Sequence, residues 1–113
     1  MSRRSKSPSG LACAAPLFAA LGDDTRLALV AWLCEGGSWS TARLTARSEV
    51  TRQAVTKHLQ VLADAGLVRN TRVGRERIWA LEPQKVAKAR RALDEISRLW
   101  DEKLDRLATY VEK

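Results

Sequence analysis

Residues 51–67, which read TRQAVTKHLQVLADAGL, decide the fold of this chain. Thr51 is a favoured helix N-cap and Gly66 is a typical helix stop, so a helix is predicted from Arg52 to about Ala65. At 100° per residue, three aliphatic side chains fall within about 60° of one another and mark the buried face of this helix. These side chains are Val55, Leu59 and Leu62.

The opposite face of the same helix carries side chains that can make hydrogen bonds, with only one formal charge among them. They are Gln53, Thr56, Lys57 and Gln60. A face that is merely solvated would more often be rich in Glu and Lys. This composition therefore favours a surface that recognises another molecule.

Three shorter helices are predicted before this one. The first covers about residues 11–21, and the third begins after Ser40, a good N-cap. The second helix ends at Gly36 and Gly37, because consecutive glycines stop a helix. An aspartate caps the start of the second helix, and the two candidates are Asp23 and Asp24.

Two strands, residues 67–71 and 77–81, are predicted around a loop at residues 72–76. Gly74 can supply the positive φ that a hairpin turn requires. The hairpin carries four arginines against one acidic residue, Glu76. The arginines are Arg69, Arg72, Arg75 and Arg77. Because this basic hairpin directly follows a helix–turn–helix pattern, it favours a contact with nucleic acid.

The last predicted helix begins near Pro83, a residue favoured in the first helical turn. Eight apolar side chains of this helix fall within an arc of about 80° and form a stripe. They are Val86, Ala89, Leu93, Ile96, Trp100, Leu104, Leu107 and Val111. A helix over residues 86–111 would be about 39 Å long, more than a domain of this size can cover. We therefore expect the second half of the stripe to bind a second copy of the chain.

The composition fits one small domain that binds a polyanion. The chain has 113 residues, of which 45% are apolar and 29% charged, enough for a single core. The formal net charge is +7, and residues 41–81 alone carry eight basic and three acidic residues. A charge excess confined to one segment is typical of nucleic-acid binders. Residues 1–10 are expected to be a flexible basic tail that precedes a domain at 11–113.

Other classes of protein find little support. One His and two Cys leave no catalytic set, so no enzyme is expected. The apolar stretch near the N-terminus is interrupted by Pro16 and is too short for a signal peptide or a membrane span. This predicts a cytoplasmic protein without a membrane partner. An RNA-binding or protein-interaction module on the same fold is the alternative, and binding without base-pair preference would favour it.

The predicted order of elements, four helices, two strands and a final helix, is that of a winged helix-turn-helix, mainly α with a small β-hairpin. Four stretches resemble the ArsR family of small dimeric bacterial transcriptional repressors: LFAALGDDTRLALVAWLCEGG, VTRQAVTKHLQVLADAGLV, VGRERIWALEP and LWDEKLDRLATYVEK. The resemblance covers about residues 15–112. It is most specific where AVTKHLQVLADAGLV is followed by GRERIW.

The resemblance implies that the helix at 52–64 enters the major groove of double-stranded DNA and that the wing at 72–77 lies beside it. The implied DNA-binding residues are Thr51, Arg52, Gln53, Thr56, Lys57, Arg72, Arg75 and Arg77. The resemblance also implies a homodimer, held by the first and last helices, on a palindromic operator. The candidate dimer contacts are Leu17, Trp100, Leu104, Leu107 and Val111. The identity of the effector does not follow from the resemblance.

Metal-sensing members of that family carry Cys ligands on the helix before the turn, or Asp, His and Glu on the last helix. Residues 40–49 hold no Cys or His and residues 84–113 hold no His, so no metal or other cofactor is expected. Cys13 and Cys34 are expected to be small buried hydrophobic residues, with a thiol switch or a soft-metal site as the alternative. His58 is expected on the helix flank with a backbone or phosphate partner.

Overall fold

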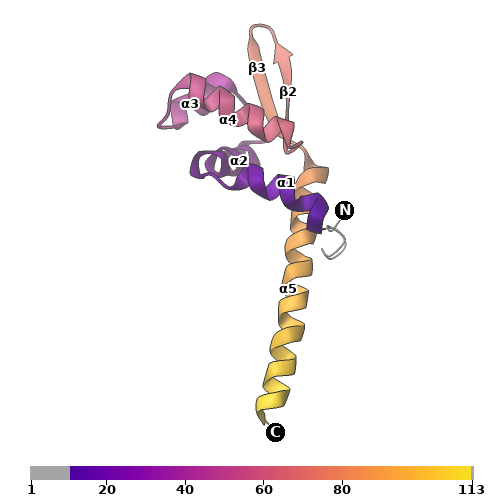
Figure 1. Cartoon of the computed structure of the whole chain (residues 1–113). Helices are drawn as coiled ribbons and strands as arrows, with labels where there is room; N and C mark the ends of the chain where they lie inside the picture. The colour runs from indigo at the N-terminus through magenta and orange to yellow at the C-terminus, as the bar shows by residue number, and fades with distance from the viewer. Residues whose placement is uncertain (1–10, 113) are drawn as a thin grey trace, which may run out of the picture.

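The computed structural model describes residues 11–112, which form a winged helix-turn-helix (Figure 1). In chain order the elements are α1 (Leu11–Leu21), α2 (Asp24–Gly36), β1 (Ser38–Ser40), α3 (Thr41–Arg47), α4 (Arg52–Asp64), β2 (Val68–Val73), β3 (Glu76–Leu81) and α5 (Pro83–Glu112). Apart from β1, this order confirms the fold predicted from the sequence. The basic tail expected at residues 1–10 lies outside the described residues.

Three helices begin at the side-chain N-caps that the sequence predicts. Asp23 caps α2, because its Oδ2 accepts the backbone N–H groups of Thr25 and Arg26 at 2.9 and 3.1 Å. Ser40 caps α3 and Thr51 caps α4, and each hydroxyl oxygen accepts one backbone N–H at 3.1 Å. These bonds satisfy N–H groups that have no partner inside the helix and fix where each helix begins.

The sheet has three antiparallel strands in the order β1–β3–β2, one strand more than predicted. β1 covers three residues and pairs with β3, so that Trp39 lies opposite Trp79. A strand of three residues is too short to show an alternating pattern, and the sequence therefore gave no sign of it. Only the pairing with β3 makes this segment a strand.

The hairpin of β2 and β3 is longer than predicted. Its ladder ends with Val73 opposite Glu76, so Gly74 and Arg75 alone form the turn. Gly74 has a φ of +63°, and a glycine at the first position of a two-residue turn suits type II′. The loop predicted at 72–76 is thus wrong by three residues, because cross-strand pairing continues almost to the tip.

The core lies between the helices and the inner face of the sheet. It contains the three side chains predicted for the buried face of α4, each fully buried: Val55, Leu59 and Leu62. Leu17 of α1 also belongs to this core and is 2% exposed. We expected Leu17 at the dimer interface, but a side chain already covered within its own protomer has almost no surface left to bury against a partner. The structure therefore corrects Leu17 to a core residue.

Trp39 fills a tight space between the end of α2 and the start of α3. Its side chain is buried, and a Cβ built on Gly36 would lie 1.7 Å from its Nε1. Only a glycine at position 36 leaves room for the indole ring. Trp39 precedes the N-cap of α3 and Leu44 in α3 is also buried, which is the spacing of a hydrophobic staple.

Both cysteines are exposed, so the prediction that they are buried is wrong. Cys13 precedes the buried Ala14 within α1, and Cys34 follows the buried Leu33 in α2. Neighbouring residues of a helix point about 100° apart. Burial of Ala14 and Leu33 therefore turns the two thiols towards solvent.

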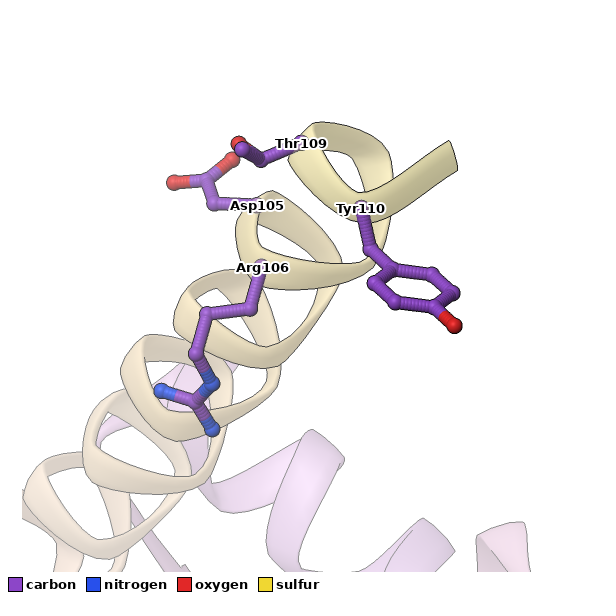
Figure 2. A pocket seen from close by; sticks show the side chains of 4 residues that line it. All are labelled: Asp105, Arg106, Thr109 and Tyr110. Carbon is purple, nitrogen blue, oxygen red and sulfur yellow. The ribbon is translucent and has the colours of Figure 1, made fainter. Parts of the chain in front are cut away.

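α5 spans thirty residues, and only its first part packs against the rest of the fold (Figure 1). Ala89 and Ala92 are buried where α5 runs beside α1. The large apolar side chains beyond this point are exposed: Leu93, Ile96, Leu99, Trp100, Leu104, Leu107, Tyr110 and Val111. Figure 2 shows side chains of the last turns extending outward from α5: Asp105, Arg106, Thr109 and Tyr110. No helix within residues 11–112 is both long and apolar enough to span a membrane.

We predict that Gly36→Ala destabilises the fold by about 1–3 kcal/mol, because the new methyl group forces the buried Trp39 ring out of its place. Urea unfolding followed by circular dichroism measures this loss. The control is Gly22→Ala, whose Cβ would meet its nearest atoms at 3.5 Å, an ordinary contact. Equal stability of the two variants would contradict the tight fit of Trp39.

Candidate nucleic-acid interface

α4 turns one face to the core and the opposite face to solvent. Gln53, Thr56 and Lys57, predicted to point outward, are all exposed. Together with Thr51 and Arg52 they line a hollow of about 720 Å³ around the first turns of the helix. The backbone N–H groups and the dipole at a helix N-terminus favour anions there. The structure thus brings these five predicted residues together on one open surface.

Two polar side chains on this face of α4 bond within the helix. Thr51 Oγ1 accepts the backbone N–H of Ala54 at 3.1 Å, and its own proton remains available for donation. Gln60 Nε2 donates to Asp64 Oδ1 at 2.9 Å. Gln60 is therefore exposed as predicted, but its amide is directed to the C-terminal end of α4 and away from the hollow.

The four arginines of the hairpin differ in whether a carboxylate lies beside them. Arg69 pairs with Glu82, with 3.1 Å between Nη1 and Oε1, and this carboxylate offsets its charge. Arg72 and Arg77 lie directly opposite each other in the ladder, and Arg75 lies in the turn. Within residues 11–112, no carboxylate oxygen lies within 4 Å of these three guanidinium groups. The tip of the wing is therefore a cluster of unneutralised cations.

Buried hydrogen bonds fix the wing to α3. Trp79 Nε1 donates to Thr41 Oγ1 at 2.8 Å, and Thr41 Oγ1 donates to the backbone oxygen of Arg77 at 3.4 Å. Both side chains are buried, and a buried donor without a partner is costly, so these bonds hold β3 in place against α3. Arg77 Nη1 also donates to Asn70 Oδ1 at 2.8 Å, which orients the guanidinium. Thr41 was not among the predicted functional residues, because nothing in the local pattern marks a partner 38 residues away.

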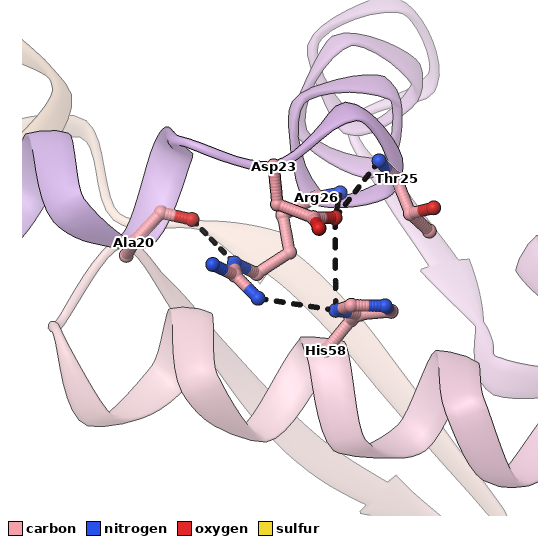
Figure 3. A network of polar contacts seen from close by, with 5 residues as sticks. All are labelled: Ala20, Asp23, Thr25, Arg26 and His58. Atoms are coloured by element: carbon pink, nitrogen blue, oxygen red, sulfur yellow. Dashed lines mark hydrogen bonds and ion pairs between the residues drawn. The ribbon is translucent and has the colours of Figure 1, made fainter.

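His58 connects α4 to the start of α2, as Figure 3 shows. Its Nδ1 lies 3.2 Å from Arg26 Nη1 and 3.9 Å from Asp23 Oδ2, so its contacts are side chains and not the expected backbone group. Arginine can only donate, so Nδ1 accepts from Arg26 when the ring is neutral and faces Asp23 as an ion pair when it is protonated. Arg26 Nε also donates to the backbone oxygen of Ala20, which brings α1 into the network.

The pKa of Asp23 lies below its usual value of 3.8. The largest cause is the backbone N–H of Arg26, which donates to the carboxylate, and the positive charges of His58 and Arg26 act in the same direction. Desolvation opposes these effects without cancelling them. The ionised form of Asp23 is thus the form that the fold stabilises.

The exposed polar groups on α4 and the wing are mostly cations and hydrogen-bond donors, together with the Gln53 amide, which both donates and accepts; Glu76 is the exposed carboxylate of the wing. Such groups match phosphate oxygens and the edges of bases. Among the side chains of residues 11–112, no three His, Cys, Asp or Glu are grouped so that they could hold a metal ion. The chemistry that the surface offers is the recognition of a polyanion.

Known proteins resemble the chain in both sequence and structure. A family model described as a helix-turn-helix domain matches residues 21–71. An HTH-type transcriptional regulator of Mycobacterium tuberculosis is 36% identical over 93 residues, which cover 82% of this chain and 83% of the relative. The arsenical resistance operon repressor of Escherichia coli is 31% identical over 88 residues, covering 78% of this chain and 75% of that protein. An ArsR-like transcriptional regulator from Rhodococcus sp. RHA1 superposes with a TM-score of 0.71 at 36% identity, covering 87% of this chain and 92% of its own.

The helix-turn-helix of α3 and α4, the adjoining wing and these relatives define a DNA-binding transcriptional regulator with a winged helix-turn-helix fold. Within that class, the chain belongs to the ArsR family. The resemblance seen in the sequence is thereby confirmed.

We predict that Asp23→Asn lowers the thermal unfolding temperature at neutral pH. The difference in unfolding temperature between this variant and the unchanged protein, called the gap below, should disappear at acidic pH. A carboxylate whose pKa is lowered on folding stabilises the fold above its unfolded pKa, about 3.8, and this contribution disappears as the pH falls through the lower folded value. Melting curves at pH 7, 4 and 3 measure the gap.

The matched control for this prediction is Asp24→Asn, since the Asp24 side chain accepts no hydrogen bond from the described residues. We expect the gap for Asp23→Asn to narrow more than the gap for Asp24→Asn. A gap at Asp23 that stays constant from pH 7 to pH 3 would contradict the assignment.

Proposed function

We propose that this regulator is a homodimeric repressor that binds a palindromic operator and leaves it when an effector binds. The observation that supports this most is the joint exposure of the polar face of α4 and the cationic wing tip, which projects past α4 in Figure 1. The relatives named as arsenical resistance operon repressors support the repressor role. The name of these relatives describes those proteins alone, so it does not identify the effector of this chain.

In this proposal α4 reads the base edges in the major groove. Gln53 lies one residue after the helix start, where side chains of a recognition helix reach the bases. Its amide can donate and accept at once, which suits N6 and N7 of adenine. Arg52, Thr56 and Lys57 lie around it and supply further contacts to bases and phosphates.

The wing tip binds the backbone of the DNA in the same proposal. Arg72, Arg75 and Arg77 carry charges that no carboxylate of the described residues offsets. Arg75 in a tight turn has no fixed neighbour that would align it with one base, so a phosphate suits it better. The wing then contributes affinity and salt dependence, and α4 contributes the sequence preference.

Two copies of the chain pair through the exposed stripe of α5. Trp100, Leu104, Leu107 and Val111 are between 44% and 78% exposed and lie on one side of the helix. A stripe of this length in water is unfavourable, and a second identical stripe covers it with matching side chains. A two-fold dimer presents two α4 helices, which calls for a palindromic operator with half-sites about 34–36 Å apart.

DNase footprinting on the DNA upstream of the protein's own gene tests the proposal as a whole. We expect protection of a palindromic sequence at a protein concentration that leaves scrambled duplexes unprotected. Equal binding to every duplex would instead favour a module without base preference, such as an RNA-binding or protein-interaction domain.

We predict that substitutions in α4 and in the wing weaken DNA binding in different ways. Gln53→Ala should weaken operator binding by about 1–3 kcal/mol and leave random DNA nearly unaffected. Arg75→Ala should weaken both duplexes alike and reduce the slope of log affinity against log salt by about 2 per dimer. Salt titrations of both variants on operator and scrambled duplexes measure these effects.

The matched control for the wing is Arg69→Ala, because Arg69 already has Glu82 as an ion-pair partner. We expect it to change the salt slope less than Arg75→Ala does. If Gln53→Ala weakens both duplexes equally, or if Arg75→Ala leaves the slope unchanged, the division between base reading and phosphate binding is wrong.

We predict that Leu104→Glu converts the dimer to monomers, because a charge buried without a partner costs several kcal/mol. The control is Thr109→Glu, which adds the same charge on the opposite side of α5, about 180° from the stripe. Sedimentation at micromolar concentration distinguishes the two variants. An unchanged protein that sediments as a monomer would refute the dimer.

A further inference from the structure

A second hollow, separate from the α4 surface, lies between the end of α2 and the first turns of α5. Its volume is about 490 Å³, within the usual range for small-molecule sites. Most of its wall is apolar, and one basic side chain is part of the lining. The residues that matter for its chemistry are Leu33, Leu81, Pro83, Val86, Ala87 and Arg90.

The charge that lines this hollow is positive and comes from Arg90. Arg90 is exposed, and within residues 11–112 no carboxylate oxygen lies within 4 Å of its guanidinium group. No acidic side chain lines the hollow either. A guanidinium beside an apolar wall complements a molecule with an apolar body and a carboxylate, which arginine can bind through two hydrogen bonds.

The hollow extends sideways from the apolar stripe of α5, with which it shares only Val86. Pro83, Val86, Ala87 and Arg90 centre about 90° around the helix from that stripe. A second copy of the chain seated on the stripe therefore leaves this side of α5 open. The lining of the hollow includes short residues from both helices, among them Cys34 of α2 and Ala87 of α5.

The position of the hollow links it to the DNA-binding elements. Only Glu82 separates β3, the second strand of the wing, from α5. α2, which forms the other wall, packs against α4. A ligand in the hollow touches both sides, so any difference in the spacing of α2 and α5 between the DNA-bound and free states becomes a difference in ligand affinity.

We propose that this hollow is the effector site and that the effector is a small organic acid, with its apolar body against Leu33, Leu81 and Val86 and its carboxylate on Arg90. The inference deepens the proposed function, on which its regulatory part rests, since it names the class of molecule that releases the repressor. Binding of the acid itself is independent of whether the chain represses transcription.

Isothermal titration of the full chain with octanoate, and with 1-octanol as the uncharged equivalent, tests the site without DNA. We expect octanoate to bind one molecule per chain. Arg90→Gln should weaken octanoate about tenfold, the loss of one charge-assisted pair, and leave 1-octanol unchanged. Arg91→Gln is the matched control, because Arg91 is an exposed neighbour that does not line the hollow.

A second variant locates the apolar part of the ligand. Ala87→Leu fills the hollow and should abolish binding of both octanoate and 1-octanol. Circular dichroism shows whether the Ala87→Leu variant folds. If this variant does not fold, the Arg90→Gln variant by itself tests the proposal. Binding that survives in folded Ala87→Leu would place the ligand outside the hollow and overturn the proposal.

The regulatory part is tested on the DNA fragment identified by footprinting. Saturating octanoate should weaken DNA binding several-fold, and the DNA should weaken octanoate binding by the same factor. The absence of octanoate binding would overturn the proposal, even if the DNA is bound. If the chain binds octanoate but shows no preference among DNA sequences, the proposed repressor function is refuted and the organic-acid site is retained. If the chain binds both octanoate and the operator, and neither ligand changes the affinity for the other, the effector role is refuted.

Discussion

Burial of one face of α4 in the core positions the DNA-binding surface on its other face. Val55, Leu59 and Leu62 are each fully buried, so the helix cannot rotate without exposing aliphatic surface to water. The opposite face of α4 must therefore point away from the core and into solvent. The polar surface around Gln53 and Lys57 is therefore positioned by hydrophobic packing on the other side of the same helix, while the Thr51 cap fixes where the helix begins.

The wing depends on a different kind of contact. Thr41 and Trp79 belong to elements far apart in the chain, and their buried hydrogen bond ties β3 to the start of α3. β1 adds a second attachment, because it pairs with β3 and leads directly into α3. A hairpin held at its base by two such attachments presents its arginines at a fixed distance from α4, which a free loop could not do.

α5 serves three regions of the molecule at once. Its first turns continue directly from the wing, its buried alanines pack beside α1, and its second half carries the exposed stripe. The hollow beside Arg90 is lined by the end of β3, the first turns of α5 and the end of α2. A change at this junction can reach both the wing and the paired helices, whereas a change at the end of α5 would reach only the partner.

The order of the helices, their caps, the inner and outer faces of α4 and the exposed stripe of α5 could all be predicted from the sequence. Each of these follows from local periodicity and from capping residues such as Asp23, Ser40 and Thr51, which act within a few residues of their position. Four features became visible only in the folded chain: Ser38–Ser40 is a strand, Leu17 belongs to the core, Cys13 and Cys34 face solvent, and His58 contacts Arg26 and Asp23. These features arise between segments that are distant in the chain, and the free energy of such a contact exists only once both segments have been brought together.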